Sequence, residues 1–402
     1  MNPVSRKAPA HPSAEAQRRL DYFNERCDAI VSTIRELVEI ESPSDNKAAV
    51  DRMAEAVAQE FSQLGGDVDI RIHPAKDFGN HLQIDFDFPG KSAAKPVLLL
   101  GHYDTVYPLG TLAAMPCRAV GNKLTGPGVL DMKSGIALML HALAALQAWH
   151  KEDWHKGLPR PVTVLLVSDE EAGSGSSRAI TESLAKKAAA VLVLEPAYGF
   201  QGAVKTARKG VGGYLVKVTG KAAHAGLDFQ KGVNAILELA RQIEKISSFT
   251  DLKKGLTVNV GVVSGGSRTN VVPSEAAAQV DVRIARIKDA AGIDKQMRRL
   301  RPFNRKCKIK ITGGINRPPM ERTAGVAALY AQAAAIAREL GWKLGEAAVG
   351  GGSDGNFTAG LGIPTLDGLG AVGDGAHAPL EHILISELPR RAALIAGLIE
   401  RA

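Results

Sequence analysis

Residues 96–106 read PVLLLGHYDTV, an apolar run that stops at a glycine and continues in polar residues. A short apolar run without polar alternation is typical of a strand that is buried on both faces of an α/β sheet. Because residues two apart in a strand point the same way, His102 and Asp104 should project together from its carboxyl end, the edge where open α/β sheets bind ligands. A lone His-x-Asp is more often a solvated strand end than a site, so the functional interpretation depends on other segments.

Two later strands are expected to deliver polar groups to the same edge. Residues 162–167 and 191–194 are again unbroken runs of Val, Leu and Thr, and they are followed by SDEE at 168–171 and by Glu195. Asp131 follows a glycine-rich turn and precedes an apolar helical segment. Acidic or imidazole groups after three buried strands predict one site at the carboxyl edge of a doubly wound sheet.

The order of the predicted elements divides the chain into two domains. Before residue 205 we expect helices and strands at 18–40, 48–64, 67–72, 81–86, 96–100, 135–147, 162–167 and 191–194, with 81–86 and 96–100 as neighbouring strands. The following elements have the order β-α-β-β-α-β, the signature of a ferredoxin-like unit, at 214–218, 233–246, 257–263, 276–285, 290–300 and 307–312. The chain then returns with elements at 325–340, 363–366 and 386–401.

These elements predict the domain bounds. An α/β domain is formed by residues 18–208 and 318–402, and an inserted α+β domain by residues 209–317. Residues 1–17 contain several prolines and no apolar segment typical of a signal peptide, so we expect a flexible tail.

Composition narrows the classes of protein. The 402 residues are 45% hydrophobic and 23% charged, as in ordinary globular proteins. The net charge of +8 is spread along the chain apart from a basic run at 297–310, and no aromatic interleaving marks a nucleic-acid site. The three cysteines lack metal-ligand spacing, and no apolar run approaches the roughly 20 residues that cross a bilayer. We therefore expect a cytoplasmic protein without nucleic-acid or membrane partners.

Seven side chains form the predicted site: His102, Asp104, Asp131, Glu170, Glu171, Glu195 and His377. Two imidazoles with three carboxylates suit a pair of divalent ions, each held by one histidine, one terminal carboxylate and one shared carboxylate. Two such ions about 3.5–4 Å apart can activate one water and polarise a carbonyl, but a base must still take the proton. Adjacent Glu170 and Glu171 offer that division, since one can ligate while the other faces the water.

Six motifs occur in one order along the chain: GHYDTV at 101–106, GPGVLD at 126–131, DEE at 169–171, LEP at 194–196, GKAAHAG at 220–226 and GGGSD at 350–354. With these motifs the sequence resembles the M20 family of metallopeptidases, and within it the glutamate carboxypeptidases, over nearly the whole chain after the first forty residues. The resemblance implies a zinc-exopeptidase-like catalytic domain, an inserted lid and dimerisation domain, and two divalent metal ions, expected to be Zn²⁺.

The resemblance also implies roles for single residues. The implied metal ligands are His102, Asp131, Glu171, Glu195 and His377, with Asp131 bridging the two ions. Glu170 is the implied general base, and Asp104 is the carboxylate that orients His102. The peptide bond between Asp131 and Met132 is expected to be cis.

Further residues are assigned to substrate by the same resemblance. His224, which taken alone is an ordinary loop histidine, would stabilise the oxyanion in the site of the partner subunit. Asn270, Arg283 and Arg317, in isolation surface polar groups, would bind the free carboxylate of the substrate. Gly352 belongs to a glycine run at 350–355 that lacks the Lys-Ser/Thr of a P-loop, so a substrate-approach loop is favoured over a nucleotide site.

These inferences together predict a cytoplasmic, homodimeric di-zinc amidohydrolase. It would cleave an amide next to a free carboxylate in a small peptide or an N-acyl amino acid, as a carboxypeptidase or a deacylase. A dipeptidase or aminopeptidase of the same family is the alternative, and it needs an acidic group to hold a free α-amine. A non-catalytic binding protein on this scaffold is a third possibility, although the complete set with its general base argues against it.

Overall fold

The computed structural model describes residues 13–64, 67–87, 94–151 and 160–401. The chain divides into two compact units: unit 1 comprises Met1–Ala207, Arg322–Ala348 and Ser353–Ala402, and unit 2 comprises Arg208–Glu321 and Val349–Gly352. Each unit has its own apolar core.

The second piece of unit 2, Val349–Gly352, was not part of the inserted domain that the sequence predicted, which comprised residues 209–317. Val349–Gly352 clusters with unit 2 because its backbone carbonyls are held by residues at the start of that unit. The Lys209 N–H donates to the Val349 carbonyl at 3.0 Å, and the Arg208 guanidinium donates to the carbonyl of Gly352 at 3.1 Å.

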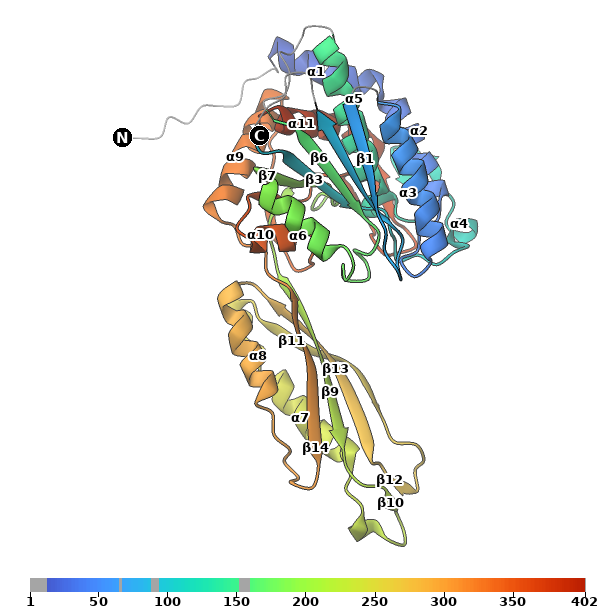
Figure 1. Cartoon of the computed structure of the whole chain (residues 1–402), viewed down its shortest axis with the longest axis vertical. Coiled ribbons are helices and arrows are strands. Elements are labelled where there is room, and N and C mark those ends of the chain that lie inside the picture. Colours follow the sequence, from blue (N-terminus) through green and yellow to red (C-terminus); the bar gives the residue numbers. More distant parts are fainter. Residues whose placement is uncertain (1–12, 65–66, 88–93, 152–159, 402) are drawn as a thin grey trace, which may run out of the picture. The chain divides into compact units, whose positions relative to one another are not determined.

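A six-stranded sheet organises unit 1 (Figure 1). Its order is β1 (Asp67–His73), β2 (His81–Asp87), β6 (Val162–Val167), β3 (Val97–His102), β7 (Ala190–Val193) and β16 (Thr365–Leu366). The last four are parallel, whereas β1 and β2 are antiparallel additions. The expectation that β2 and β3 are neighbours was wrong, because β6 lies between them and bonds to both.

The central strands of this sheet are buried on both faces, as their unbroken apolar runs predicted. Along β3, Val97 and Leu99 belong to the large core, while Leu98 and Leu100 belong to a smaller core on the opposite face. The large core also contains residues of α2 (Cys27–Glu39), α3 (Lys47–Ser62), α5 (Ser134–Lys151), α9 (Ala324–Glu339) and α11 (Leu388–Arg401). The smaller core lies under α6 (Arg178–Lys187), which the sequence analysis did not identify.

The beginning of the described chain differs from expectation. Instead of one helix at 18–40 there are two, α1 (Ala14–Glu25) and α2, separated at Arg26, which has φ −106° and ψ 10°. The Ser13 hydroxyl accepts from the Ala16 N–H and caps α1, so residues 14–17 of the expected flexible tail are helical. The rest of that expected tail, residues 1–12, lies outside the described residues.

One helical stretch is longer and more apolar than the sequence analysis expected of any segment in this chain. By length and composition, Val129–His150 could cross a membrane. However, 83% of its apolar window is buried inside the structure. A buried core helix passes the same test, so burial accounts for its apolar composition.

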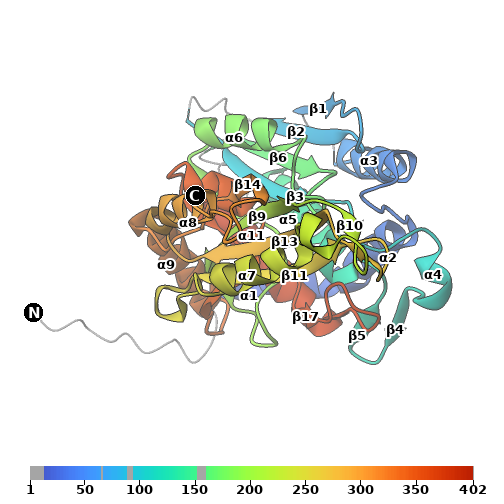
Figure 2. The ribbon, with the colours of Figure 1, turned by 90° about the horizontal axis from the view of Figure 1, so that it is seen from below.

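A small antiparallel sheet in unit 1 joins segments that are distant in the sequence (Figure 2). Its order is β17 (Gly373–Asp374), β18 (His382–Leu384), β5 (Lys123–Thr125) and β4 (Arg118–Val120). Strands of two or three residues carry too little pattern to be recognised from sequence. Other elements of the unit are α4 (Thr111–Ala114), α10 (Gly355–Gly360), and the pair β8 (Val204–Arg208) and β15 (Glu346–Val349). The turn Val129–Lys133 precedes α5, and its Asp131 and Met132 have non-helical backbone angles.

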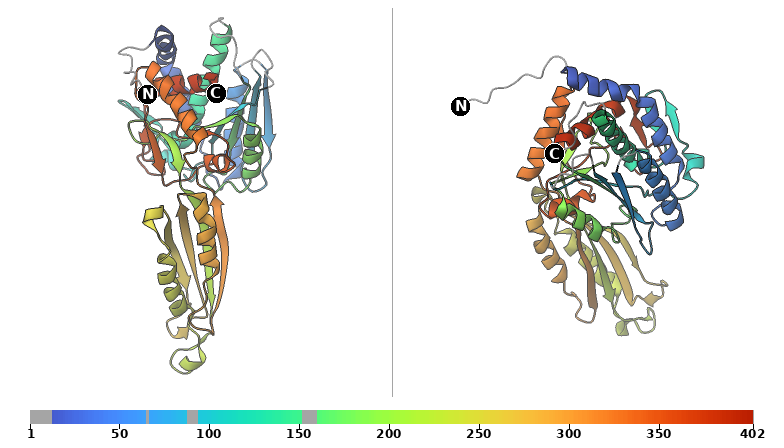
Figure 3. Two further views of the ribbon diagram at one scale, coloured as in Figure 1. Left: turned by 90° about the vertical axis from the view of Figure 1, so that its left-hand side faces the viewer. Right: turned by 45° about the horizontal axis from the view of Figure 1, so that its top comes forward.

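Unit 2 has the predicted β-α-β-β-α-β order. Its elements are β9 (Gly210–Thr219), α7 (Ala235–Ser247), β11 (Thr257–Gly265), β13 (Glu275–Ile284), α8 (Ala290–Arg298) and β14 (Lys308–Arg317), and the antiparallel sheet has the order β11-β13-β9-β14. Both helices cover one face (Figure 3), where Tyr214, Val216 and Val218 of β9 are buried. A short antiparallel pair of β10 (Ala223–His224) and β12 (Val271–Val272) belongs to the same unit. The ferredoxin-like fold class is confirmed.

Candidate metal centre

The parallel strands bring their polar ends to one edge of the sheet. His102 is the last residue of β3, Glu171 lies in the turn after β6, and Glu195 follows β7. Asp131 lies in the turn that precedes α5, and His377 lies in the loop between β17 and β18. These five residues, expected from the sequence to converge, form two groups of neighbouring ligand atoms.

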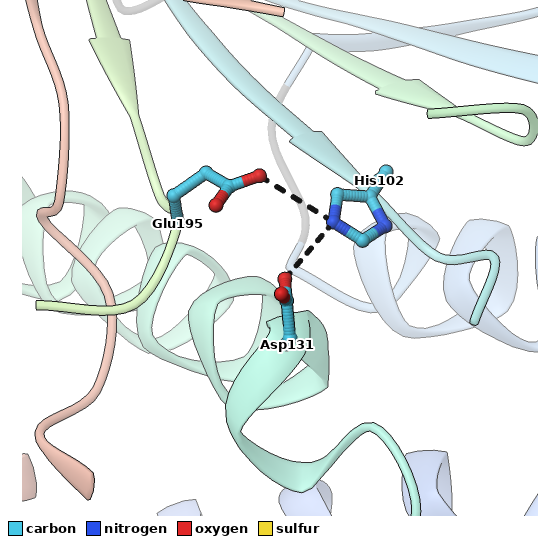
Figure 4. A group of neighbouring side chains, drawn as sticks. All are labelled: His102, Asp131 and Glu195. Atoms are coloured by element: carbon cyan, nitrogen blue, oxygen red, sulfur yellow. Dashed lines mark hydrogen bonds and ion pairs between the residues drawn. The ribbon is translucent and has the colours of Figure 1, made fainter. Parts of the chain in front are cut away.

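The first group consists of His102, Asp131 and Glu195, whose side chains point toward one another (Figure 4). The His102 Nε2 lies 3.2 Å from Asp131 Oδ1 and 3.5 Å from Glu195 Oε1. His102 and Glu195 are buried, whereas Asp131 is partly accessible.

The second group consists of Asp131, Glu171 and His377. The His377 Nε2 lies 2.9 Å from Glu171 Oε1 and 3.4 Å from Asp131 Oδ2. Asp131 therefore presents one carboxylate oxygen to each histidine. Within each group all ligand atoms lie within 4.8 Å of one another.

Asp104 orients His102 through the ring nitrogen that faces away from Asp131 and Glu195. The His102 Nδ1 lies 3.0 Å from the Asp104 carbonyl and 3.4 Å from its carboxylate, so Nδ1 carries the proton and Nε2 is left as the ligand atom. The buried Asp104 carboxylate accepts from the Ser44 hydroxyl at 2.6 Å and from the backbone N–H groups of Glu170 and Glu171 at 3.2 and 3.1 Å. One carboxylate thus holds both the imidazole and the turn that carries the two glutamates.

The turn before Asp131 depends on its glycine. Gly128 has φ 70°, and a Cβ there would come within 2.6 Å of the Thr105 Cγ2.

The peptide bond between Asp131 and Met132 is cis, which confirms the bond geometry that the resemblance implied.

Hydrogen bonds and charges within the two groups shift the pKa values of their histidines and of Asp131. Burial alone would lower the pKa of His102, but its hydrogen bonds to Asp104, Asp131 and Glu195 outweigh burial and raise that pKa well above its usual value. Hydrogen bonds to Asp131 and Glu171 raise the pKa of His377 to about 10. Burial opposes ionisation of Asp131, yet the two imidazoles hold its pKa below the usual range. Because metal ligation requires neutral imidazoles, metal binding would release protons from these histidines.

The donor set fits a pair of divalent ions. Imidazole nitrogen and carboxylate oxygen suit borderline divalent metals such as zinc. Among the described residues, each of these two groups brings three side chains of metal-ligating type together, and Asp131 belongs to both groups. A carboxylate with one oxygen directed to each group is the arrangement that a bridging ligand requires.

Two residues expected at the substrate, His224 and Asn270, lie at the paired strands β10 and β12 of unit 2. His224 ends β10, and the neighbouring Ala225 N–H donates to the Asn270 carbonyl at 2.9 Å. The His224 Nδ1 accepts from the backbone N–H groups of Gly226 and Leu227 at 3.2 and 3.1 Å. In the neutral imidazole the proton is therefore on Nε2, which leaves an exposed donor.

The two arginines lie on strands that flank β9. Arg283 on β13 and Arg317 on β14 both pair with Val211. The Arg283 Nε donates to the two carboxylate oxygens of Asp281 at 2.9 and 3.1 Å, a partner that the sequence analysis did not anticipate. Gly352, also in unit 2, accepts from Arg208 through its carbonyl.

Sequence reasoning missed Ser44 and Glu381. Ser44 was not singled out in the sequence, yet its hydroxyl donates to the Asp104 carboxylate. Glu381 follows His377 by four residues and is fully buried beside the turn that carries Asp131. An acidic residue so close to a predicted ligand was the available signal, but nothing local in the sequence predicts its burial.

The fold and the paired ligand groups define a metallohydrolase with a ferredoxin-like insertion. The chain belongs to peptidase family M20/M25/M40, whose profile matches residues 98–401, and the resemblance found in the sequence is thereby confirmed. This family includes dinuclear metal-binding hydrolases.

Three relatives illustrate the range of the family. The chain is 32% identical to carboxypeptidase G2 of Pseudomonas sp. (strain RS-16) over 381 residues, which cover 92% of this chain and 88% of the relative. Aminopeptidase PepT from Bacillus cereus matches with a TM-score of 0.71 at 22% identity, covering 93% of this chain and 98% of that one. The Bacillus subtilis YXEP protein, described as a dinuclear metal-binding peptidase, matches with a TM-score of 0.67 at 15% identity, covering 95% and 98%. The two structural matches speak for the fold alone.

Proposed function

We propose that this chain is a di-zinc carboxypeptidase or N-acyl-amino-acid deacylase that cleaves an amide next to a free carboxylate. The observation that carries the proposal is the pair of ligand groups that share Asp131. The 32% identity to carboxypeptidase G2 over most of both chains supports a carboxypeptidase, with a C-terminal amino acid such as glutamate as the product.

In this proposal His102, Asp131 and Glu195 hold one ion, and Asp131, Glu171 and His377 hold the other. The ions, when bound, would polarise the amide carbonyl and lower the pKa of a water molecule between them. Asp104 keeps the His102 proton on Nδ1.

Glu170 is the proposed general base. Its N–H donates to the Asp104 carboxylate, and the next residue in the turn, Glu171, is a proposed ligand. These two facts support a role for Glu170 beside the centre. It would take the proton of the attacking water and deliver it to the nitrogen of the breaking amide. The C–N bond then breaks, releasing an amine and a carboxylate.

His224 is the proposed donor to the oxyanion, in the site of a partner subunit. The hydrogen bonds that Nδ1 accepts leave its Nε2–H free to donate. A homodimer through unit 2 is supported by β11, an edge strand of the sheet whose Val262 and Val263 are 52% and 54% exposed.

The proposed contacts to the substrate carboxylate come from Arg283, Arg317 and Asn270, with Gly352 in the approach loop. Guanidinium groups can bind carboxylates through two parallel hydrogen bonds. Arg283 already holds a carboxylate, because its Nε–H is shared between the two oxygens of Asp281. Under this proposal the substrate carboxylate takes the place of the Asp281 side chain. We further propose a cytoplasmic location, in line with the three unpaired cysteines.

The test is a matched substrate panel with metal-depleted and zinc-restored protein. An N-acyl amino acid, the same compound with its α-carboxylate amidated, and the corresponding dipeptide with a free amine are compared. We expect zinc-dependent hydrolysis that requires the free carboxylate and tolerates a blocked amine. A requirement for the free amine would instead identify an aminopeptidase or dipeptidase, and no hydrolysis by protein with two ions bound would indicate a binding protein.

A further inference from the structure

Glu381 is a buried carboxylate with a complete set of donors. Its Oε1 accepts from the backbone N–H groups of Leu130 at 2.7 Å and Asp131 at 3.0 Å. Its Oε2 accepts from the Gly128 N–H at 3.3 Å and from the Tyr107 hydroxyl at 2.6 Å. The side chain is fully buried, so these four donors replace the water that a carboxylate otherwise binds.

The three backbone donors belong to the turn that ends in Asp131. Glu381 itself lies at the end of the β17–β18 hairpin loop, four residues after His377. The Tyr107 hydroxyl also lies 3.0 Å from the Ala378 carbonyl of the same loop. The Glu381 carboxylate therefore connects the segments that carry two of the three residues in the second ligand group.

The small sheet strengthens the same connection. Strand β5 leads into the turn, and β18 follows Glu381 directly; the two strands pair with Leu124 opposite Ile383 and Thr125 opposite His382. The Gly126 N–H also donates to the Glu381 carbonyl at 3.4 Å. The pairing of β5 with β18 brings the two segments together, and the Glu381 carboxylate then holds the turn at Leu130 and Asp131 against the loop that carries His377.

We propose that Glu381 is a positioning residue for the metal centre, holding Asp131 and His377 at the separation that a second ion requires. This inference rests on the proposed function of these groups as metal ligands. Glu381 touches neither ion in this account. It acts through the backbone of Asp131, as groups that orient metal ligands commonly do.

Unit 2 contains a chemically matched residue that belongs to neither ligand group. The buried Glu238 carboxylate on α7 accepts from the backbone N–H groups of Phe303 at 3.0 Å and Asn304 at 2.8 Å, and from the Gln242 amide at 2.8 Å. It connects α7 with the segment after α8. Loss of its charge should affect folding in the same way as at Glu381 but should leave the metal centre untouched.

The experiment compares Glu381→Gln with Glu238→Gln. Glutamine keeps the shape of glutamate but replaces one acceptor oxygen by an NH₂ group. Whichever way the amide lies, at least one N–H of the Asp131 turn then loses its acceptor. The metal-free proteins are titrated with Zn²⁺ against a chromogenic chelator, and their thermal midpoints are measured without metal.

We expect Glu381→Gln to weaken Zn²⁺ binding by about 10–100-fold, the usual effect of removing a group that orients ligands. Tyr107→Phe removes one donor of four and should fall between this variant and the wild type. Glu238→Gln should bind Zn²⁺ within about threefold of the wild type, since no ligand depends on it.

Unchanged affinity in Glu381→Gln would overturn the inference, and so would an equal loss of affinity in both variants. Neither outcome depends on turnover. An inactive wild-type protein that binds two ions would refute the proposed function alone, and the comparison of the two glutamates would still decide the role of Glu381.

Discussion

The two units place polar residues in different ways. In unit 1, β3, β6 and β7 are parallel, so residues that follow them converge on one edge although they are far apart in sequence: His102, Glu171 and Glu195. In unit 2 neighbouring strands are antiparallel and their ends alternate between the two edges. Its proposed substrate residues lie instead at the β10–β12 pair and on the strands either side of Val211. Strand direction therefore decides which unit can assemble a metal centre.

Burial of the sheets differs in the same way. The central strands of unit 1 are covered on both faces, and β3, β6 and β7 are buried throughout. The sheet of unit 2 has helices on one face, and β9 alternates between buried and accessible residues. The candidate ligands of unit 1 therefore follow strands that are buried throughout, whereas the sheet of unit 2 leaves one face and an edge strand accessible.

The largest effect is expected at the shared carboxylate. Asp131→Ala should lose both ions and all measurable activity, because it removes a ligand from each group and leaves carboxylates that repel one another. Zinc should raise the thermal midpoint of the wild type but not of this variant. Asp294→Ala, which removes a carboxylate of unit 2 that pairs with Arg298, is the control and should retain two ions. Two ions in Asp131→Ala would exclude a shared role.

Glu170→Gln should lower kcat by about 10²–10⁴ with the metal content unchanged, because only proton transfer loses its partner. Glu182→Gln on α6, which disrupts a pair with Arg178 in the same unit, is the control. More than about a tenth of wild-type activity in Glu170→Gln would show that another group is the base.

His224→Ala tests whether unit 2 contributes to the centre of another chain. We expect a loss of about 10²–10³ in kcat with both ions bound, since one oxyanion donor is removed. Reassembly of mixtures with Glu170→Gln should restore activity, because a mixed dimer has one site with both residues intact. Heterodimers verified by mass spectrometry that remain inactive would restrict His224 to its own chain or to a structural role.

The smallest effect concerns His141 on α5. Burial lowers the pKa of His141 to about 4, and its Nε2 lies 3.0 Å from the Thr33 hydroxyl. Below pH about 6.5 the unfolded chain binds a proton that the folded chain refuses, so stability is lost as the pH falls toward 4. The contribution is at most about 3 kcal/mol.

Urea unfolding of the metal-free protein at pH 7 and pH 4.5 measures how much stability is lost as the pH falls, including the contribution of His141. His141→Gln should show a smaller loss of stability between the two pH values than the wild type. Equal losses in the two proteins would assign the acid sensitivity to other groups.

Much of this architecture could be predicted from the sequence because the patterns are local. The apolar runs of β3, β6 and β7 and the alternation in unit 2 are visible in short windows. The convergence of His102, Glu171 and Glu195 also follows, because parallel strands end at one edge. Asp131 and His377 lie in loops, and this argument does not place them.

The remaining features depend on contacts between distant segments. Strand β6 separates β2 from β3, and the small sheet joins β5 to β18; neither pairing leaves a pattern in one segment. The residues alone required a shared carboxylate, but its assignment to Asp131 came from the resemblance. Glu381 was missed because its burial depends on a turn about 250 residues earlier.

The most direct test of the central claim is anomalous diffraction at the zinc edge from crystals of the zinc-loaded protein. We expect two anomalous peaks about 3.5–4 Å apart, one on each side of the Asp131 carboxylate. The first should lie beside His102 and Glu195, and the second beside Glu171 and His377. A single peak, or two peaks that do not share Asp131, would contradict the account.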